Sequence, residues 1–348
     1  MSQFVPTFGI EEELFLTEPT RPHLSALYYM ARLLWRNPRY YYKHSATNFA
    51  RGRDVRSGLM STVEIATRPH TDPDALIAEL RLRRQELASV VDAAYIVPIG
   101  HLFDCDAPTN TGGLHLHIGV PAPYQERVYA NLAHFLPLLS LLTVSSPYVN
   151  GRYFGPSYRM ARSFAIGALR EDPYYRFQDL ILSRRLGTIE IRLLDPVWDL
   201  ERVRWLVRAV SAIVQLPDAY PLDREQYAVL RQQACERGFT PDLQARYWEL
   251  ARWISVPESL FQRTVSDQLA EWMAQYGLLH TYASLDRAYR TGHWQVVEPR
   301  PVSSRPYRAV LGVLGYYLPR LPYTAYKAWV EWKKPARSPE SPDLAPAP

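Results

Sequence analysis

The chain carries near its start the stretch TFGIEEELFL, residues 7–16, in which apolar and polar side chains alternate. A period of two is typical of a half-buried β-strand, because successive side chains of a strand point to opposite faces. Glu11 and Glu13 are therefore expected on the same face of one strand, about 6.5 to 7 Å apart. Two carboxylates placed in this way are the first indication of a functional site.

Three later stretches repeat the arrangement: VEIAT at residues 63–67, GLHLHIG at residues 113–119 and GTIEIR at residues 187–192. Each is typical of a strand that carries charged or imidazole side chains between apolar ones. His115 and His117 would share a face, and so would Glu190 and Arg192. If the four strands are neighbours in one sheet, the following side chains converge on one surface: Glu11, Glu13, Glu64, His115 and Glu190.

Four carboxylates in a small volume repel one another. Two unit charges 4 Å apart cost about 4 kcal/mol at an effective dielectric constant near 20, so the cluster needs cations, protonation or arginines. Carboxylate oxygens with one imidazole suit magnesium or manganese, whereas zinc would require more histidine or cysteine. Taken alone, each glutamate motif also fits a solvent-exposed strand, and the H-x-H motif also fits an ordinary pair of histidines on a sheet. The four motifs together favour a metal site.

Helical periodicity separates these strands. Asp72 followed by Pro73 is typical of a helix start, and apolar residues recur at helical spacing to about Val91. Similar patterns predict helices over residues 24–36, 125–143 and 200–215, and an apolar run predicts a further strand over residues 94–102. Strands and helices do not alternate regularly, which favours an α+β fold with helices covering one side of a largely antiparallel sheet.

The pattern changes beyond residue 220, where short amphipathic helices are predicted over residues 224–237, 241–254, 258–276 and 280–290. We expect residues 1–220 to form a catalytic core and residues 221–334 to form a mostly helical part packed on it. Residues 335–348 are rich in proline, serine and acidic residues, so we expect a disordered tail there.

Composition excludes several classes of protein. The 348 residues are 47% hydrophobic and 22% charged, which is ordinary for a globular protein, and no apolar run is long enough for a transmembrane segment. Residues 1–13 show no basic and apolar leader, so a cytoplasmic location is expected. Cys105 and Cys235 lie far apart without metal-site spacing, which argues against a disulfide framework or a thiolate zinc site.

The net charge of +5 raises the question of nucleic-acid binding. The arginines are dispersed along the chain instead of being clustered, and lysine occurs at only four positions. A nucleic-acid partner is therefore not expected, and the charge is better explained by a site that binds anions.

The ordered set of motifs FGIEEE, VEIAT, GLHLHIGV, SSP, SYR and GTIEIR resembles the carboxylate–amine ligases of the glutamate–cysteine ligase type 2 group. More distantly, its E-x-E, H-x-H and E-x-R elements resemble strands of glutamine synthetase. The resemblance covers about residues 7–200. It implies a glutamine synthetase-like catalytic domain, in which a curved, largely antiparallel sheet carries helices on its outer face, followed by a helical C-terminal part.

The resemblance also implies an activity, the ATP-dependent joining of a glutamate-like acid to an amino acid amine through an acyl phosphate, with Mg²⁺ or Mn²⁺. The implied metal ligands are Glu11, Glu13, Glu64, His115 and Glu190. The implied catalytic residues are Glu13, Glu190 and Arg192. The implied ATP contacts are His117, Arg184, Arg185 and Arg192, and the implied substrate contacts are Arg159, Thr67 and Gly113.

The chain departs from the family pattern between Arg159 and Gly187, where it is shorter and where FQDLILSRR, residues 177–185, replaces the usual approach to the last strand. Two other functions stay open. One is a metal-dependent hydrolase. The other is a catalytically silent relative that serves as a binding or scaffold module, for which the aromatic and basic segment from Tyr307 to Lys334 is the support. Small-molecule acid and amine substrates are the expected partners, and the sequence leaves homo-oligomer formation open.

Overall fold

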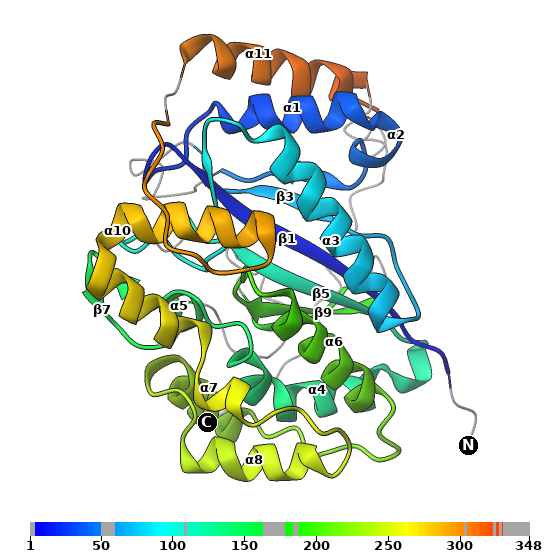
Figure 1. The fold of residues 1–348 in the computed structure, drawn as a ribbon. Coiled ribbons are helices and arrows are strands. Elements are labelled where there is room, and N and C mark those ends of the chain that lie inside the picture. Colours follow the sequence, from blue (N-terminus) through cyan, green and yellow to red (C-terminus); the bar gives the residue numbers. More distant parts are fainter. Residues whose placement is uncertain are drawn as a thin grey trace, which may run out of the picture.

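The centre of the protein is an antiparallel β-sheet, shown in Figure 1. The computed structural model describes residues 4–49, 60–107, 110–162, 178–183, 187–302, 305–322, 325–326 and 329. Within them the sheet has seven strands in the order β2-β3-β1-β5-β9-β8, and β4 pairs with the end of β1. The strands are β1 (Thr7–Thr17), β2 (Ser45–Thr47), β3 (Val63–Ala66), β4 (Tyr95–Val97), β5 (Gly113–Gly119), β8 (Leu180–Ser183) and β9 (Thr188–Leu194).

Helices cover the apolar face of this sheet. The apolar side chains of β1, β5 and β9, such as Phe8, Leu116 and Ile191, are fully buried in one large core. Helices α3 (Pro73–Val90), α4 (Gln125–Ser140) and α6 (Leu200–Val214) contribute to that core, and so do helices of the C-terminal part. The start of α3 is as predicted, because the Asp72 side chain accepts hydrogen bonds from the first backbone N–H groups of the helix. The mixture of helices and antiparallel sheet confirms the predicted α+β class.

The middle residue of the EEE motif lies on this covered face. Glu12 is fully buried, and its carboxylate accepts hydrogen bonds from Arg84 of α3 and from the hydroxyl of Tyr289. Arg84 also donates to the backbone carbonyls of Val197 and Trp198. Glu12, Arg84 and Tyr289 therefore connect the central strand β1 with α3, with α10 (Val265–Thr291) and with the segment that leads into α6.

Beyond residue 220, the part of the chain that the structure describes is helical. Its helices are α7 (Arg224–Glu236), α8 (Pro241–Ala251), α9 (Ser259–Gln262), α10 (Val265–Thr291) and α11 (Pro306–Tyr317). α7 and α8 pack against α4, and α11 lies along α1 (Ala26–Arg36) at one end of the molecule (Figure 1). The helix predicted over residues 258–276 is divided into α9 and the first part of α10, because the chain is extended at Arg263 and Thr264. α10 then continues through a kink, where Gly277 has a φ of 75°, into the helix predicted over residues 280–290. The division of the chain at residue 220 stays a prediction.

Some elements differ from the sequence predictions. The strand predicted over residues 94–102 is limited to β4, because the chain then leaves the sheet and the Gly100 N–H donates to the Ser145 hydroxyl. The segment after Ser146, for which no helix or strand was predicted, contains a short hairpin, β6 (Tyr148–Val149) with β7 (Arg152–Tyr153), and the helix α5 (Tyr158–Arg162). Strand β8 was not predicted. The short helix α2 (Pro38–Tyr41) follows α1.

Two sequence expectations concern other parts of the chain. The tail predicted over residues 335–348 lies outside the described residues. None of the helices that the structure describes combines the length and the apolar character needed to cross a lipid bilayer.

Candidate functional site

The register of the sheet brings the predicted polar residues onto one face. Glu11 on β1 lies opposite His115 on β5, and Glu13 lies opposite Glu64 on β3. His117 in turn lies opposite Glu190 on β9. Directly opposed residues of an antiparallel pair have neighbouring side chains on the same face. The four stretches singled out in the sequence are thus adjacent strands, and their polar side chains lie on the face opposite to the one that α3, α4 and α6 cover.

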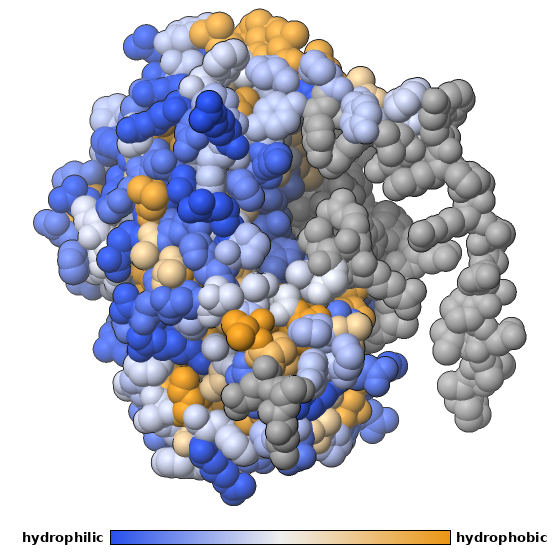
Figure 2. Space-filling view, turned by 90° about the vertical axis from the view of Figure 1, so that its right-hand side faces the viewer, coloured by the Kyte–Doolittle hydropathy of each residue, from blue (hydrophilic) through white to orange (hydrophobic). Residues whose placement is uncertain are grey.

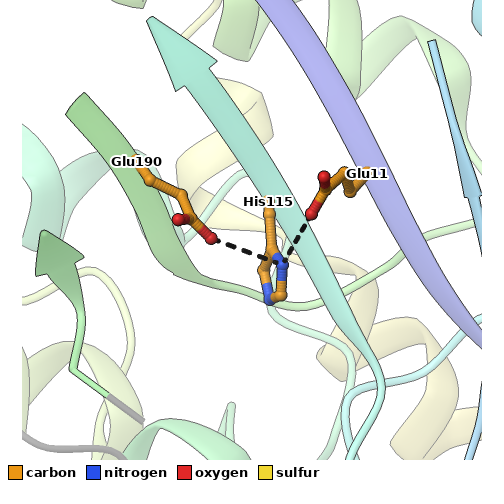
Figure 3. Close-up of side chains that lie close together, drawn as sticks. All are labelled: Glu11, His115 and Glu190. Atoms are coloured by element: carbon orange, nitrogen blue, oxygen red, sulfur yellow. Dashed lines mark ion pairs between the residues drawn. The ribbon is translucent and has the colours of Figure 1, made fainter. Parts of the chain in front are cut away.

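Glu11, His115 and Glu190 form the centre of this face (Figure 3). One ligand atom from each lies within 4.8 Å of the others. His115 Nδ1 is 3.7 Å from Oε2 of Glu11 and 3.7 Å from Oε1 of Glu190. Ligand atoms bound to one Mg²⁺ or Ca²⁺ ion at roughly 2.0 to 2.6 Å lie about 3 to 5 Å from one another, so these three side chains fit a single divalent ion.

Glu13 and Glu64 lie beside this centre. His115 Nε2 is 3.8 Å from Oε2 of Glu13, whose other oxygen accepts a hydrogen bond of 3.0 Å from the Asn48 side chain. Burial, together with the negative charges of Glu11 and Glu13, raises the pKa of Glu64 well above its ordinary value. Asn48 was not predicted as a site residue. It directly follows the short strand β2 and has no motif around it, so only the fold reveals its position.

The charges of Glu11 and His117 depend on each other. Burial raises the pKa of Glu11, but hydrogen bonds and positive charge from His115 and His117 outweigh it and hold that pKa well below its usual range. Burial lowers the pKa of His117, but the carboxylates of Glu11 and Glu190 raise it above its ordinary value. His117 Nε2 lies 3.3 Å from Oε2 of Glu11. The carboxylates of Glu11 and Glu190 thus favour the protonated, positively charged form of His117. A divalent ion supplies positive charge of the same kind.

Two arginines lie at the same face. Arg192, two residues after Glu190 on β9, forms an ion pair with the Glu190 carboxylate. Arg159 of α5 is buried, and its two terminal nitrogens donate to the backbone carbonyls of Leu193 and Arg192 at 2.8 and 2.9 Å. Burial lowers the pKa of Arg159. Arg159 therefore contributes to holding β9 in place, and only its other N–H groups remain for a ligand.

Asp195, directly after β9, accepts the hydrogen bonds that link the SSP and SYR motifs to the site. Its buried carboxylate accepts hydrogen bonds from the hydroxyls of Ser146 and Ser157 and from the Ser145 N–H, at 2.7 to 3.0 Å. It also lies 3.7 Å from Arg159. These contacts fix the start of α5 against the end of β9. Sequence reasoning missed Asp195, although its position after the IEIRLL strand was a usable signal.

Gly113 occupies the space between the functional side chains. A Cβ atom added there would lie 2.8 Å from Arg159 Nη2, 2.9 Å from His115 Nε2 and 3.0 Å from Glu13 Oε2. Glycine is thus the residue that allows these three groups to come together.

Replacing Gly113 with alanine is expected to weaken Mn²⁺ binding about tenfold, because the methyl group would displace His115 or Glu13. A loss of this size is typical when a contact that supports a metal ligand is removed. Isothermal titration with Mn²⁺ measures this change. Gly9→Ala is the matched control, since an added Cβ on that glycine of β1 meets no heavy atom closer than 3.9 Å. Equal Mn²⁺ affinity in both variants would contradict the proposed crowding.

The remaining predicted residues are placed less centrally or lie outside the described residues. The Thr67 hydroxyl accepts a hydrogen bond of 2.9 Å from the Ile10 N–H, so it supports the pairing of β1 with the chain after β3. Its role as a substrate contact stays a prediction. Arg184 and Arg185 lie outside the described residues.

Comparison with known proteins gives the same resemblance as the motifs. No family model matches the chain. The chain is 26% identical over 267 residues to a protein of Bordetella petrii named "Putative glutamate--cysteine ligase 2", covering 60% of this chain. It is 28% identical over 205 residues to a protein of the same name from Bradyrhizobium diazoefficiens, covering 51% of this chain. The chain spans only 64% and 44% of the length of these two relatives. The predicted resemblance to the glutamate–cysteine ligase type 2 group is therefore confirmed.

Two solved structures share the fold. A bifunctional glutathione synthetase from Pasteurella multocida matches with a TM-score of 0.60 and 14% identity, over 82% of this chain and 52% of that one. A glutamate–cysteine ligase from Francisella tularensis in complex with AMP matches with a TM-score of 0.59 and 11% identity, over 96% of both chains. At these identities the likeness concerns the fold alone.

Proposed function

We propose that this chain is an ATP-dependent ligase that joins a carboxylic acid to an amine. The observation that carries the proposal is the convergence of Glu11, His115 and Glu190, from three adjacent strands, within 4.8 Å. The similarity to relatives named glutamate–cysteine ligase 2 supports the reaction class, and the AMP complex among the structures of similar fold supports the use of ATP. We further propose that the sheet and its helices form a glutamine synthetase-like catalytic domain.

The donor set of the site fits Mg²⁺ or Mn²⁺. Carboxylate oxygens dominate it, and these hard ions prefer oxygen ligands. Glu11, His115 and Glu190 would hold one ion, and Glu13 with Glu64 would hold another. When bound, such ions neutralise the charge that spreads over phosphoryl oxygens during transfer and orient the phosphates.

The residues around the ions would bind the nucleotide phosphates on one side and the acid substrate on the other. Arg192 shares the face of Glu190 and pairs with it, which supports our proposal that its guanidinium binds the transferring phosphoryl group. His117, beside Glu11, would contact nucleotide phosphate, and so would Arg184 and Arg185. Arg159, Gly113 and Thr67 would lie on the side of the acid substrate, where Gly113 allows Arg159 to approach His115 and Glu13.

The proposed reaction has two steps. An oxygen of the substrate carboxylate attacks the γ-phosphorus of ATP, the bond to the bridging oxygen breaks, and ADP leaves behind an acyl phosphate. The amine nitrogen then attacks the acyl carbon, phosphate leaves and an amide forms. Because little covalent help is required, the protein contributes mainly by positioning the reactants and by stabilising charge. A glutamate-like acid and an amino acid amine are the substrates we propose from the names of the relatives.

Release of ADP and phosphate tests the proposal directly. The protein is incubated with ATP, Mg²⁺ or Mn²⁺, and a panel of acids and amines in all pairs. We expect ADP to form at a rate that requires the divalent ion and both an acid and an amine, with one amide formed per ADP. Omission of the amine should leave at most a slow release of ADP, since only water then attacks the acyl phosphate.

The same assay distinguishes the other two functions. Cleavage of substrates without ATP would indicate a metal-dependent hydrolase, and the ligase proposal would be wrong. Absence of ADP formation with every pair, in a protein that binds Mn²⁺ and unfolds cooperatively, would indicate the catalytically silent relative.

A further inference from the structure

Helix α11 has one face packed on the protein and another face whose apolar side chains are exposed. Its inner face meets α1 so closely that a Cβ on Gly312 would lie 2.4 Å from the Tyr28 nitrogen, and Tyr316 is buried there. The outer face of α11 and the short segment that follows it carry apolar side chains that are 48% to 60% exposed: Tyr307, Val310, Leu311 and Leu314 on the helix, and Leu318 and Leu321 just beyond its end. Their spacing of three and four residues places them in one stripe. Figure 2 shows this apolar patch at the top of the molecule, where α11 lies in Figure 1.

The surface around the stripe is positively charged. Residues 299–330, which include α11, contain no aspartate or glutamate, and neither do residues 19–53, which include α1 and α2. Arg36, Arg39 and Lys43 on the α1–α2 side and Arg305 at the start of α11 are exposed. Asp92, just beyond the end of α3, is an acidic residue of this surface, and it forms ion pairs with Arg32 and Arg308. The apolar stripe is therefore framed by cations from two distant stretches of the chain.

This charge distribution decides between two partners for the stripe. Pairing of α11 with α11 of a second copy would bring two cationic surfaces together, and like charges in apposition disfavour association. An anionic lipid surface would attract the same cations while its acyl region accepts the apolar side chains. Exposed aromatic residues, Tyr307 at the start of the helix and Tyr326 and Trp329 beyond its end, suit the bilayer interface.

We infer that α11 docks the protein on anionic lipid bilayers, lying in the headgroup region with its outer apolar stripe turned toward the acyl chains. The inference is independent of the proposed reaction, because the stripe and the carboxylate cluster share no residues.

Sedimentation of the full chain with lipid vesicles tests the inference. We expect binding to phosphatidylcholine vesicles that contain phosphatidylglycerol, little binding to phosphatidylcholine alone, and weaker binding as salt rises. The double variant Leu314→Ser, Leu318→Ser is expected to bind about tenfold or more weakly, because it removes two of the inserting side chains. A second variant, Arg39→Glu with Lys43→Glu, should weaken binding only to the anionic vesicles.

Matched substitutions elsewhere make the test specific. Leu82→Ser with Val229→Ser changes two apolar side chains of similar exposure, 45% and 54%, on α3 and α7, and should leave vesicle binding unchanged. Circular dichroism confirms that each variant is folded. Binding that is insensitive to the α11 variant, or no binding to anionic vesicles, would overturn the inference. A concentration-dependent dimer in ultracentrifugation that is lost in the α11 variant would also overturn it, in favour of a second copy.

Discussion

The variant Glu190→Gln is expected to form ADP at least about 100-fold more slowly than the parent protein, because loss of one preorganised charge-stabilising group typically costs roughly 10²- to 10³-fold in turnover. Glu190 is buried, and its carboxylate faces His115 at 3.7 Å and pairs with Arg192. The amide keeps the size of the side chain and removes its charge. The measurement is ADP formation under saturating ATP and Mg²⁺ with the best acid and amine pair.

Glu225→Gln is the matched control for this loss, since Glu225 is an exposed residue at the start of α7. It should keep full activity. Titration with Mn²⁺ should show weaker binding in Glu190→Gln and unchanged binding in the control. If Glu190→Gln retains the parent rate, the assignment of Glu190 to the site is wrong, whichever substrates are used.

Glu12→Gln is expected to lower the free energy of unfolding by about 3 kcal/mol, because it leaves the buried Arg84 guanidinium without its charged partner. Glu12 is fully buried and Arg84 almost so, and Tyr289 donates to the same carboxylate at 3.1 Å. Urea denaturation followed by circular dichroism measures the change. The effect arises on the helix-covered face of β1, away from the metal site.

The neighbouring variant Glu13→Gln supplies the control, because it makes the same chemical change one residue further along the strand. Glu13 lies opposite Glu64, so its neutralisation should leave the free energy of unfolding unchanged or raise it slightly, while ADP formation falls. Equal destabilisation in the two variants would show that the alternation of faces along β1 does not separate stability from activity.

The strands of the site could be predicted because their signal is local. A period of two within each stretch places Glu11 with Glu13 and Glu190 with Arg192, whatever the rest of the chain does. The order of the strands could not be derived in that way, because pairing depends on contacts between distant residues. β1 pairs with β3 and β5, and only the arrangement of the sheet shows that their polar faces coincide.

The partners of the residues that sequence reasoning missed lie far away in the chain. Asn48 reaches Glu13 across 35 positions of the chain, and Asp195 accepts hydrogen bonds from Ser146 and Ser157 across 49 and 38 positions. Glu12 is an instructive case, since the motif presents it as one of three equivalent glutamates. Its alternation with Glu11 and Glu13 indicates the opposite face, but its partner Arg84, 72 positions away, could not be identified from the sequence.

Helix α11 also borders the last strand on its side of the sheet, β2. The Tyr317 hydroxyl lies 2.7 Å from that of Thr47, and the Tyr316 hydroxyl donates to the Ser45 carbonyl. Arg320, just beyond the helix, donates to the Ser45 hydroxyl. An uncovered edge strand is a template for pairing with the sheet of another molecule. Here aromatic and guanidinium groups occupy that border, so the sheet is closed to growth by strand addition at β2.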